Sequence, residues 1–237
     1  MRPSTLVALA RRWLVPAVFA IAAVLTALGA AHSIGKALSH PGERAVLVAI
    51  YHLLRTAVAI AFTVFTARRA EPHRHSREAL PLLACVGAMA AILAFSAPAR
   101  TTPSAFVLAG DVVAVVGCVW LLAAVLALGR CFGVLPEARG LVTRGPYRLV
   151  RHPVYLGELA AGLGLALAAP SAGNAAVLAA FFGAQLLRMG YEERALTDAF
   201  PQYARYAQAT PRLIPRLRLP SLARMTARTP ARIESRP

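Results

Sequence analysis

Long apolar blocks, rather than alternating or striped patterns, dominate the first half of the chain. Each of four blocks is close to the ~20 residues that an α-helix needs to cross the apolar core of a bilayer, about 30 Å thick. The pattern therefore predicts four membrane-spanning helices, at about residues 14–38, 45–67, 79–97 and 105–128.

Two shorter apolar blocks follow a polar stretch in the second half. They cover residues 154–169 and 174–189 and are joined by Pro170-Ser-Ala-Gly173. Sixteen helical residues reach only about 24 Å, so we expect a short or tilted hairpin, and its full crossing of the bilayer is left open. The expected fold class is an all-α, polytopic membrane bundle of four N-terminal spans plus this short C-terminal helical hairpin.

Composition supports a membrane protein and gives a hint about its partners. Hydrophobic residues make up 58% of the 237 residues, above the roughly 45–50% of a typical soluble domain. The net charge of +16 is carried almost entirely by arginine, with Lys36 as the only lysine. These arginines cluster at the ends of apolar blocks and in the tail, which favours anionic lipid headgroups over nucleic acid as partners. The three cysteines lack zinc-ligand spacing, so no metal site is expected.

The placement of arginine also predicts orientation. The second connection and the stretch after the fourth span are rich in arginine, whereas the first and third connections are not. By the positive-inside rule, both termini and the polar stretch face the cytoplasm, and the arginine-rich, lysine-poor composition favours a bacterial inner membrane. The first block also resembles a secretory signal, but its length favours an uncleaved span.

Three regions follow from these patterns. Residues 1–128 form the expected four-span region, and residues 129–215 form a second region with the polar stretch and the hairpin. The basic tail, residues 216–237, is expected to be disordered or to lie on the membrane surface.

Two charges fall inside the expected spans. Arg55 and Asp111 lie on helices that run in the same direction, roughly 15 Å and 9 Å from the outer surface. We therefore expect them to form an ion pair, and a role for Arg55 in binding substrate is the alternative. Glu158, one turn into the fifth block, is expected to pair with Arg151 or Arg148, or to contact a ligand.

The polar stretch Leu141–Gly157 reads LVTRGPYRLVRHPVYLG. Gly145-Pro146 and His152-Pro153 both predict turns, and Pro153 is suited to the first position of a helix. The N–H groups of that helix start, together with Arg151 and His152, favour binding of an anion. Lipid phosphates alone explain these cations less well, because a histidine and two tyrosines are interleaved with the turn residues.

The order of these residues resembles a known enzyme family. The series Leu141-Val-Thr-x-Gly-Pro-Tyr147, then Arg151-His152-Pro153-x-Tyr155, is followed after the next apolar block by Arg188-x-x-x-Glu192-Glu193. Both motifs resemble the isoprenylcysteine carboxyl methyltransferase family and the related phospholipid methyltransferases. The resemblance covers roughly residues 129–215.

This resemblance implies an integral-membrane methyltransferase that uses S-adenosylmethionine, with the hairpin flanking a cytoplasmic cofactor pocket. By position in the motifs it implies Arg188 and Glu193 as catalytic residues. It implies a cofactor-binding set of Arg139, Gly140, Leu141, Val142, Tyr147, Arg151, His152, Pro153, Val154, Tyr155 and Glu192.

The residue types suit that chemistry. Arg151 and His152 can hold the cofactor carboxylate, Glu192 can accept from its ammonium or ribose groups, and tyrosine rings can pack on the adenine or the sulfonium. Arg188 could align a carboxylate nucleophile. We expect a lipophilic acceptor that enters from the membrane. The alternatives are a phospholipid N-methyltransferase, a membrane reductase using NADPH, and a non-catalytic scaffold or transporter.

Overall fold

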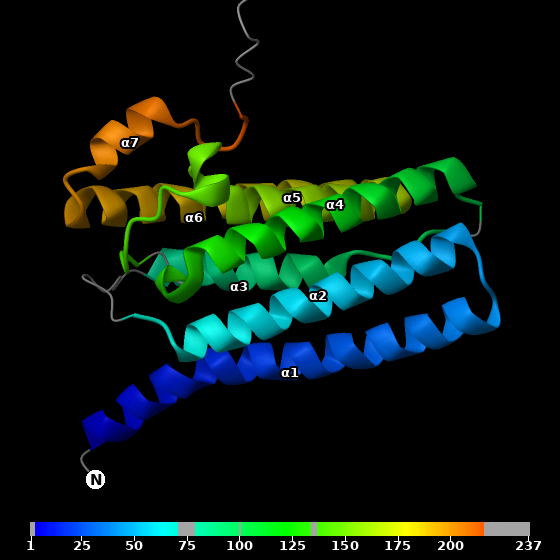
Figure 1. Ribbon diagram of the computed structural model, residues 1–237, viewed down its shortest axis with the longest axis horizontal. Helices are drawn as coiled ribbons and strands as arrows, with labels where there is room; N and C mark the ends of the chain where they lie inside the picture. The colour runs from blue at the N-terminus through cyan, green and yellow to red at the C-terminus, as the bar shows by residue number, and fades with distance from the viewer. Residues whose placement is uncertain (1–2, 71–78, 100, 134–136, 216–237) are drawn as a thin grey trace, which may run out of the picture.

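The computed structural model describes residues 3–70, 79–99, 101–133 and 137–215, and within these ranges all regular structure is helical (Figure 1). The expected all-α fold class is therefore confirmed for the described part of the chain. Seven α-helices and two short 3₁₀ turns follow one another: α1 Pro3–Ser39, α2 Glu43–Ala67, α3 Ala79–Ala94, α4 Ser104–Leu128, η1 Gly129–Cys131, η2 Gly145–Arg148, α5 Pro153–Ala168, α6 Ala172–Ala199 and α7 Tyr203–Ala209. The tail, residues 216–237, lies outside the described residues, and the proposed regional boundaries stay a prediction.

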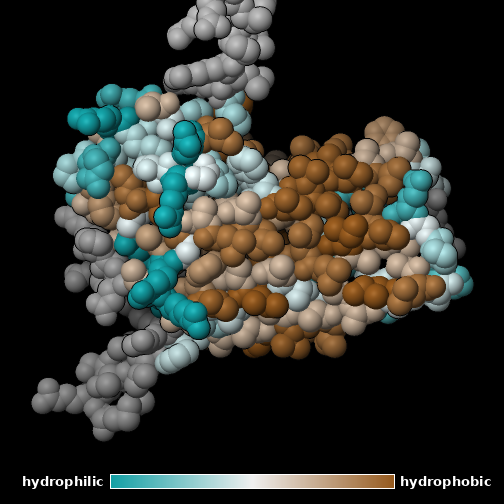
Figure 2. Space-filling model, in the orientation of Figure 1, coloured by the Kyte–Doolittle hydropathy of each residue, from teal (hydrophilic) through white to brown (hydrophobic). Residues whose placement is uncertain are grey.

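Four of the helices are long and apolar enough to cross a membrane: α1, α2, α4 and α6. Many of their large apolar side chains are exposed, among them Leu14, Ile21 and Val116. Figure 2 shows a broad apolar surface along the helices, with polar residues gathered toward their two ends. An apolar surface of this extent is typical of a membrane or protein contact.

Three helices differ in length from the expected blocks. Helix α1 begins at Pro3, well before the expected start near residue 14. Helix α3 ends at Ala94, because the following segment is extended and Asn174 accepts hydrogen bonds from the backbone N–H and the hydroxyl of Ser96, both at 3.0 Å. Helix α6 runs for 28 residues, well past Met189. Its last third contains the good helix formers Glu192-Glu-Arg-Ala-Leu196 although the apolar block has ended, and the next helix breaker is Pro201.

The helices pack in a defined order. Helix α1 packs against α2, α2 against α4, α4 against α5, and α3 against α6, while α1 and α3 share no extensive interface in the described part of the chain. The contact between α4 and α5 is the closest. An added Cβ at Gly164 of α5 would lie 2.4 Å from the backbone nitrogen of Ala114, and one at Gly110 of α4 would lie 2.3 Å from that of Ala168. Glycine here allows the two backbones to touch.

The expected ion pair between Arg55 and Asp111 is wrong. Asp111 instead accepts a hydrogen bond from Arg44 Nε at 3.3 Å, and the guanidinium of Arg55 lies over the ring of Tyr51, 5.5 Å from its centroid. Arg44 lies in the first turn of α2, and its long side chain reaches Asp111 from the end of the bundle. Arg44 and Arg55 are eleven residues apart, which places them on nearly the same side of α2 but about 16 Å apart along its axis. The partner of Asp111 is therefore decided by height along the bundle and by the reach of Arg44.

Replacement of Gly164 with alanine tests the close contact between α4 and α5. The new methyl group meets backbone atoms that cannot move away without separating the helices, so we expect the free energy of unfolding to fall by about 1–3 kcal/mol. Gly183→Ala is the matched control, because a Cβ at Gly183 meets nothing within 4 Å. Thermal unfolding in detergent measures both variants, and equal stability of the two would contradict the contact.

Candidate functional site

A cavity of about 360 Å³ lies between the helices and the turn that precedes α5. Its charged and hydroxyl-bearing residues are concentrated on the turn, on α5 and on α6: Tyr147, Arg151, His152, Tyr155, Glu158, Arg188 and Glu192. The opposite wall, from α1, α2 and α3, is almost entirely apolar and includes Phe19, Phe62 and Ile92. The cavity therefore joins a polar wall to a lipophilic one.

Local sequence explains how the turn presents its side chains. Gly145 adopts φ 60°, a conformation that favours glycine, and it opens the 3₁₀ turn that buries Tyr147. His152 is the N-cap residue of α5, and Pro153 is its first residue, as predicted. Because the residue before a proline avoids the helical conformation, the chain bends at His152 and directs its ring toward α6.

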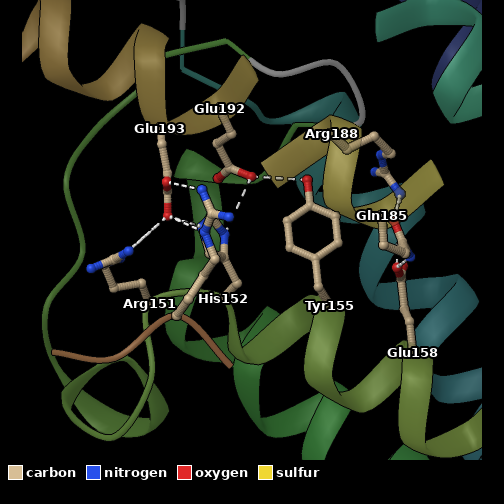
Figure 3. A network of polar contacts seen from close by, with 9 residues as sticks. Arg151, His152, Tyr155, Glu158, Gln185, Arg188, Glu192 and Glu193 are labelled. Atoms are coloured by element: carbon tan, nitrogen blue, oxygen red, sulfur yellow. Dashed lines mark hydrogen bonds and ion pairs between the residues drawn. The ribbon is translucent and has the colours of Figure 1, made fainter. Parts of the chain in front are cut away.

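The carboxylate of Glu193 joins three cationic or donor side chains (Figure 3). Its Oε1 lies 2.9 Å from Nε2 of His152 and accepts from Arg151 Nη2 at 3.1 Å, and Arg212 donates to both of its oxygens. Glu193 is not on the cavity wall. The structure therefore gives Glu193 the geometry of a positioning residue, which holds the side chains that border the cavity.

The segment after α6 is docked onto the same turn. The backbone N–H groups of Arg151 and His152 donate to the carbonyls of Pro211 and Arg212 at 2.8 Å and 3.1 Å. The Tyr206 hydroxyl donates to the carbonyl of Tyr147 at 2.6 Å. Burial raises the pKa of Tyr206 to about 12, so this hydroxyl keeps its proton at neutral pH. The hydrogen bond to Glu193 raises the pKa of Arg212 above its ordinary value, so the guanidinium of Arg212 stays positively charged.

A second group of polar contacts lies on the cavity wall. The Tyr155 hydroxyl donates to Oε2 of Glu192 at 2.9 Å, and Nδ1 of His152 lies 3.9 Å from the same oxygen. Arg188 lies over the ring of Tyr155, 5.0 Å from its centroid. Figure 3 shows these side chains side by side, with Glu192 and Glu193 directed to the two sides of His152.

Arg188 is held by two buried polar side chains. It donates to Oε1 of Gln185 at 2.8 Å and lies 3.8 Å from Oε2 of Glu158, and Gln185 also donates to Glu158. The prediction that Glu158 pairs with Arg151 or Arg148 is therefore wrong, because those two arginines lie at the turn and Arg188 reaches Glu158 from the facing helix. The sequence reasoning missed Gln185, whose signal was an uncharged polar residue within an apolar block, one turn before Arg188.

The structure brings together part of the expected cofactor set. Tyr147, Arg151, His152, Val154, Tyr155 and Glu192 all border the cavity, as does the expected catalytic residue Arg188. Arg139, Gly140, Leu141, Val142 and Pro153 do not border it. The guanidinium of Arg139 is engaged by Glu137 and by the carbonyl of Ala70, and the Pro153 carbonyl accepts from Trp120 Nε1 at 3.0 Å. The binding roles of all these residues stay predictions.

Removal of the Glu193 carboxylate tests the docking of the segment after α6. In Glu193→Ala, Arg151, His152 and Arg212 lose their shared acceptor, so we expect docking to weaken by about 1–3 kcal/mol. Amide hydrogen exchange at Arg151 and His152 should then accelerate by roughly tenfold to a hundredfold.

The control for this variant is Thr197→Ala, one turn later on α6, whose hydroxyl bonds only to the Glu193 backbone carbonyl among the described contacts. Exchange should stay at the wild-type rate in that protein. Wild-type exchange at Arg151 and His152 in Glu193→Ala would show that Glu193 does not hold the segment.

Comparison with known proteins shows which families this arrangement resembles. Residues 100–203 match the phospholipid methyltransferase family. The chain is 45% identical over 82 residues to the cobalt-zinc-cadmium resistance protein CzcN of Cupriavidus metallidurans, and 34% identical over 113 residues to the nickel-cobalt-cadmium resistance protein NccN of Alcaligenes xylosoxydans. It is 39% identical over 115 residues to protein-S-isoprenylcysteine O-methyltransferase A of Arabidopsis thaliana.

These matches cover part of each protein. They include 33%, 46% and 45% of this chain, and 37%, 48% and 57% of the three relatives in the same order. The matched region contains α4, α5, α6 and the polar wall of the cavity, and with four helices able to span a bilayer it makes this an integral membrane protein. Residues 100–203 are thus similar to the phospholipid methyltransferase family, and the resemblance to the isoprenylcysteine carboxyl methyltransferases is confirmed by the relative from Arabidopsis thaliana.

Proposed function

We propose that the protein is an S-adenosylmethionine-dependent methyltransferase that methylates a carboxylate on a lipophilic acceptor. One observation carries this proposal: a single cavity combines Glu192 and His152, the buried cation Arg188, and an apolar wall from the first three helices. A charged cofactor and an apolar acceptor need such adjoining surfaces if their reacting atoms are to meet.

The polar wall fits the chemical groups of the cofactor. Tyr155 engages one oxygen of Glu192, and the other has no hydrogen-bond donor among the described residues, so it can accept from an ammonium or a ribose hydroxyl. The rings of Tyr147 and Tyr155 offer aromatic surface for adenine or a sulfonium. When bound, the cofactor supplies an electrophilic methyl group. Because Arg151 and His152 are already engaged by Glu193, they would act mainly by shaping this end of the cavity.

Arg188 is suited to orient the acceptor. Its side chain is 12% exposed, and Gln185, Glu158 and the ring of Tyr155 hold it beside the polar wall. A guanidinium can bind both oxygens of a carboxylate and so fix the direction of a lone pair. The surrounding apolar residues exclude water, which removes the hydration of the carboxylate before it reacts.

The apolar wall supports a membrane-borne acceptor. Helices α1 and α3 both contribute to this wall without packing extensively against each other, so an acceptor can approach from the bilayer between them. Arginine-rich segments at the site end of the bundle would face the cytoplasm and contact anionic lipids, in the inner membrane of a bacterium.

One other enzyme function would use the same arrangement of cavity and helices. A phospholipid N-methyltransferase has the support of the family description, but an amine acceptor has no need of a cation such as Arg188. The metal resistance in the names of two relatives is a property of those proteins. In the described part of this chain, no three histidine, cysteine or acidic side chains are grouped to hold a metal ion.

Methyl transfer from labelled S-adenosylmethionine into a lipid extract tests the proposal. A methyl ester releases its label as methanol in mild alkali, whereas an N-methyl group retains it. We expect alkali-labile label with the wild-type protein, and about a hundredfold less with Arg188→Ala because the acceptor loses its alignment. Binding of S-adenosylhomocysteine should stay close to the wild-type level.

Two further variants complete this test. Arg188→Lys keeps the charge near Glu158 and should recover part of the activity. Arg194→Ala changes an arginine on the same helix that lies over Tyr191 and outside the cavity, so it should act as the wild type does. Alkali-stable label, with little effect of Arg188→Ala, would instead favour the amine acceptor.

A further inference from the structure

Arg55 stands apart from the other charged groups of the cavity. It comes from the middle of α2, its side chain is half-buried, and it lies on the lipophilic wall. The other described cavity residues of α1, α2 and α3 are uncharged, and most are aliphatic or phenylalanine. The cavity therefore contains a guanidinium where a plain hydrocarbon chain would need none.

No carboxylate of the described residues pairs with this guanidinium. Asp111, its expected partner, is engaged by Arg44, and the guanidinium of Arg55 lies over the ring of Tyr51 in the preceding turn and interacts with the Tyr51 hydroxyl. A charged side chain within a membrane bundle is costly unless it is paired or hydrogen-bonded. Tyr51 offsets only a part of this cost, because its ring and single hydroxyl cannot accept from all five N–H groups of the guanidinium.

The packing of the helices places Arg55 relative to Arg188. Gly157 of α5 lies against Leu121 of α4, and Leu121 shares a buried cluster with Val58 of α2. Glu158, which holds Arg188, is therefore near the level of Val58. Arg55 precedes Val58 by three residues, which places it roughly 4.5 Å farther from the site end of the bundle.

We propose that Arg55 binds a carbonyl-type oxygen in the apolar chain of the acceptor, about one helical turn from the carboxylate that Arg188 orients. This inference rests on the proposed function and narrows its substrate class. The acceptor is a carboxylic acid with an oxygen-bearing chain, and Arg55 selects it over an acid with a plain hydrocarbon chain. The oxygen supplies Arg55 with an acceptor in addition to the hydroxyl of Tyr51.

A matched pair of acids tests this selection. Dodecanoate and 5-oxododecanoate differ by one carbonyl, about 5 Å from the carboxylate, near the level of Arg55. Their dissociation constants are measured on the full chain in lipid nanodiscs with saturating S-adenosylhomocysteine. We expect the wild type to bind the oxo acid about tenfold more tightly, as for one hydrogen bond to a charged group.

Variants of two arginines on α2 separate selection from folding. Arg55→Met should bind both acids equally while it still binds S-adenosylhomocysteine, and Arg55→Lys should keep part of the preference. Arg44→Met, on the same helix but outside this cavity, should keep the whole preference. If Arg55 had only a structural role, its replacement would weaken the binding of both acids alike and leave the ratio of their dissociation constants unchanged.

The outcomes also separate this inference from the proposed function. Equal binding of the two acids by the wild type, or an unchanged preference in Arg55→Met, overturns the role of Arg55 and leaves the carboxylate acceptor intact. Binding of S-adenosylhomocysteine without binding of either acid contradicts the proposal that the acceptor is a carboxylate. The inference about Arg55 rests on that proposal and is then overturned as well.

Discussion

The site depends on one carboxylate, that of Glu193, which satisfies donors from three separate segments of the chain. Arg151 and His152 come from the turn before α5, Arg212 follows α7, and Glu193 itself lies in α6. Without this shared acceptor, neighbouring cations would repel one another at the edge of an apolar bundle. Because the backbone of the turn also bonds to residues 211 and 212, the Glu193 network fixes the polar wall of the cavity from behind.

A second constraint sets where that wall lies relative to the membrane helices. The glycines of α4 and α5 bring two backbones into contact, so the start of α5 is held at a fixed height along the bundle. Tyr155 and Glu158 are in the first two turns of α5, and the facing residues of α6 are Gln185, Arg188 and Glu192. Polar groups therefore meet where the apolar wall begins, which is the geometry that a charged donor and a lipophilic acceptor require.

Much of this arrangement follows from local chemistry and could be predicted from the sequence. The steric effect of proline on its preceding residue located the start of α5 at Pro153, and block length located α2, α4 and the end of α1 closely. The polar motifs correctly placed His152 and Glu192 at one cavity. These features depend on a few neighbouring residues, so no tertiary information is needed to find them.

Tertiary partners could not be predicted in the same way. Helix depth suggested Arg55 as the partner of Asp111, but Arg44 lies on nearly the same side of α2 and reaches Asp111 from the start of that helix, which hydropathy does not report. Hydropathy also ended α6 too early, because it measures apolar character and not helix formation. The catalytic role expected of Glu193 stays a prediction, and what the motif could not indicate is that its carboxylate also holds its neighbours in place.

The central proposal is that the cavity bordered by His152 and Glu192 holds S-adenosylmethionine. Calorimetric titration of the full chain in nanodiscs with S-adenosylhomocysteine tests it most directly. The account predicts saturable binding at one site per chain, weakened at least tenfold in Glu192→Ala because the ammonium or ribose groups lose their acceptor. Binding of NADPH without binding of S-adenosylhomocysteine would contradict the account and favour a membrane reductase.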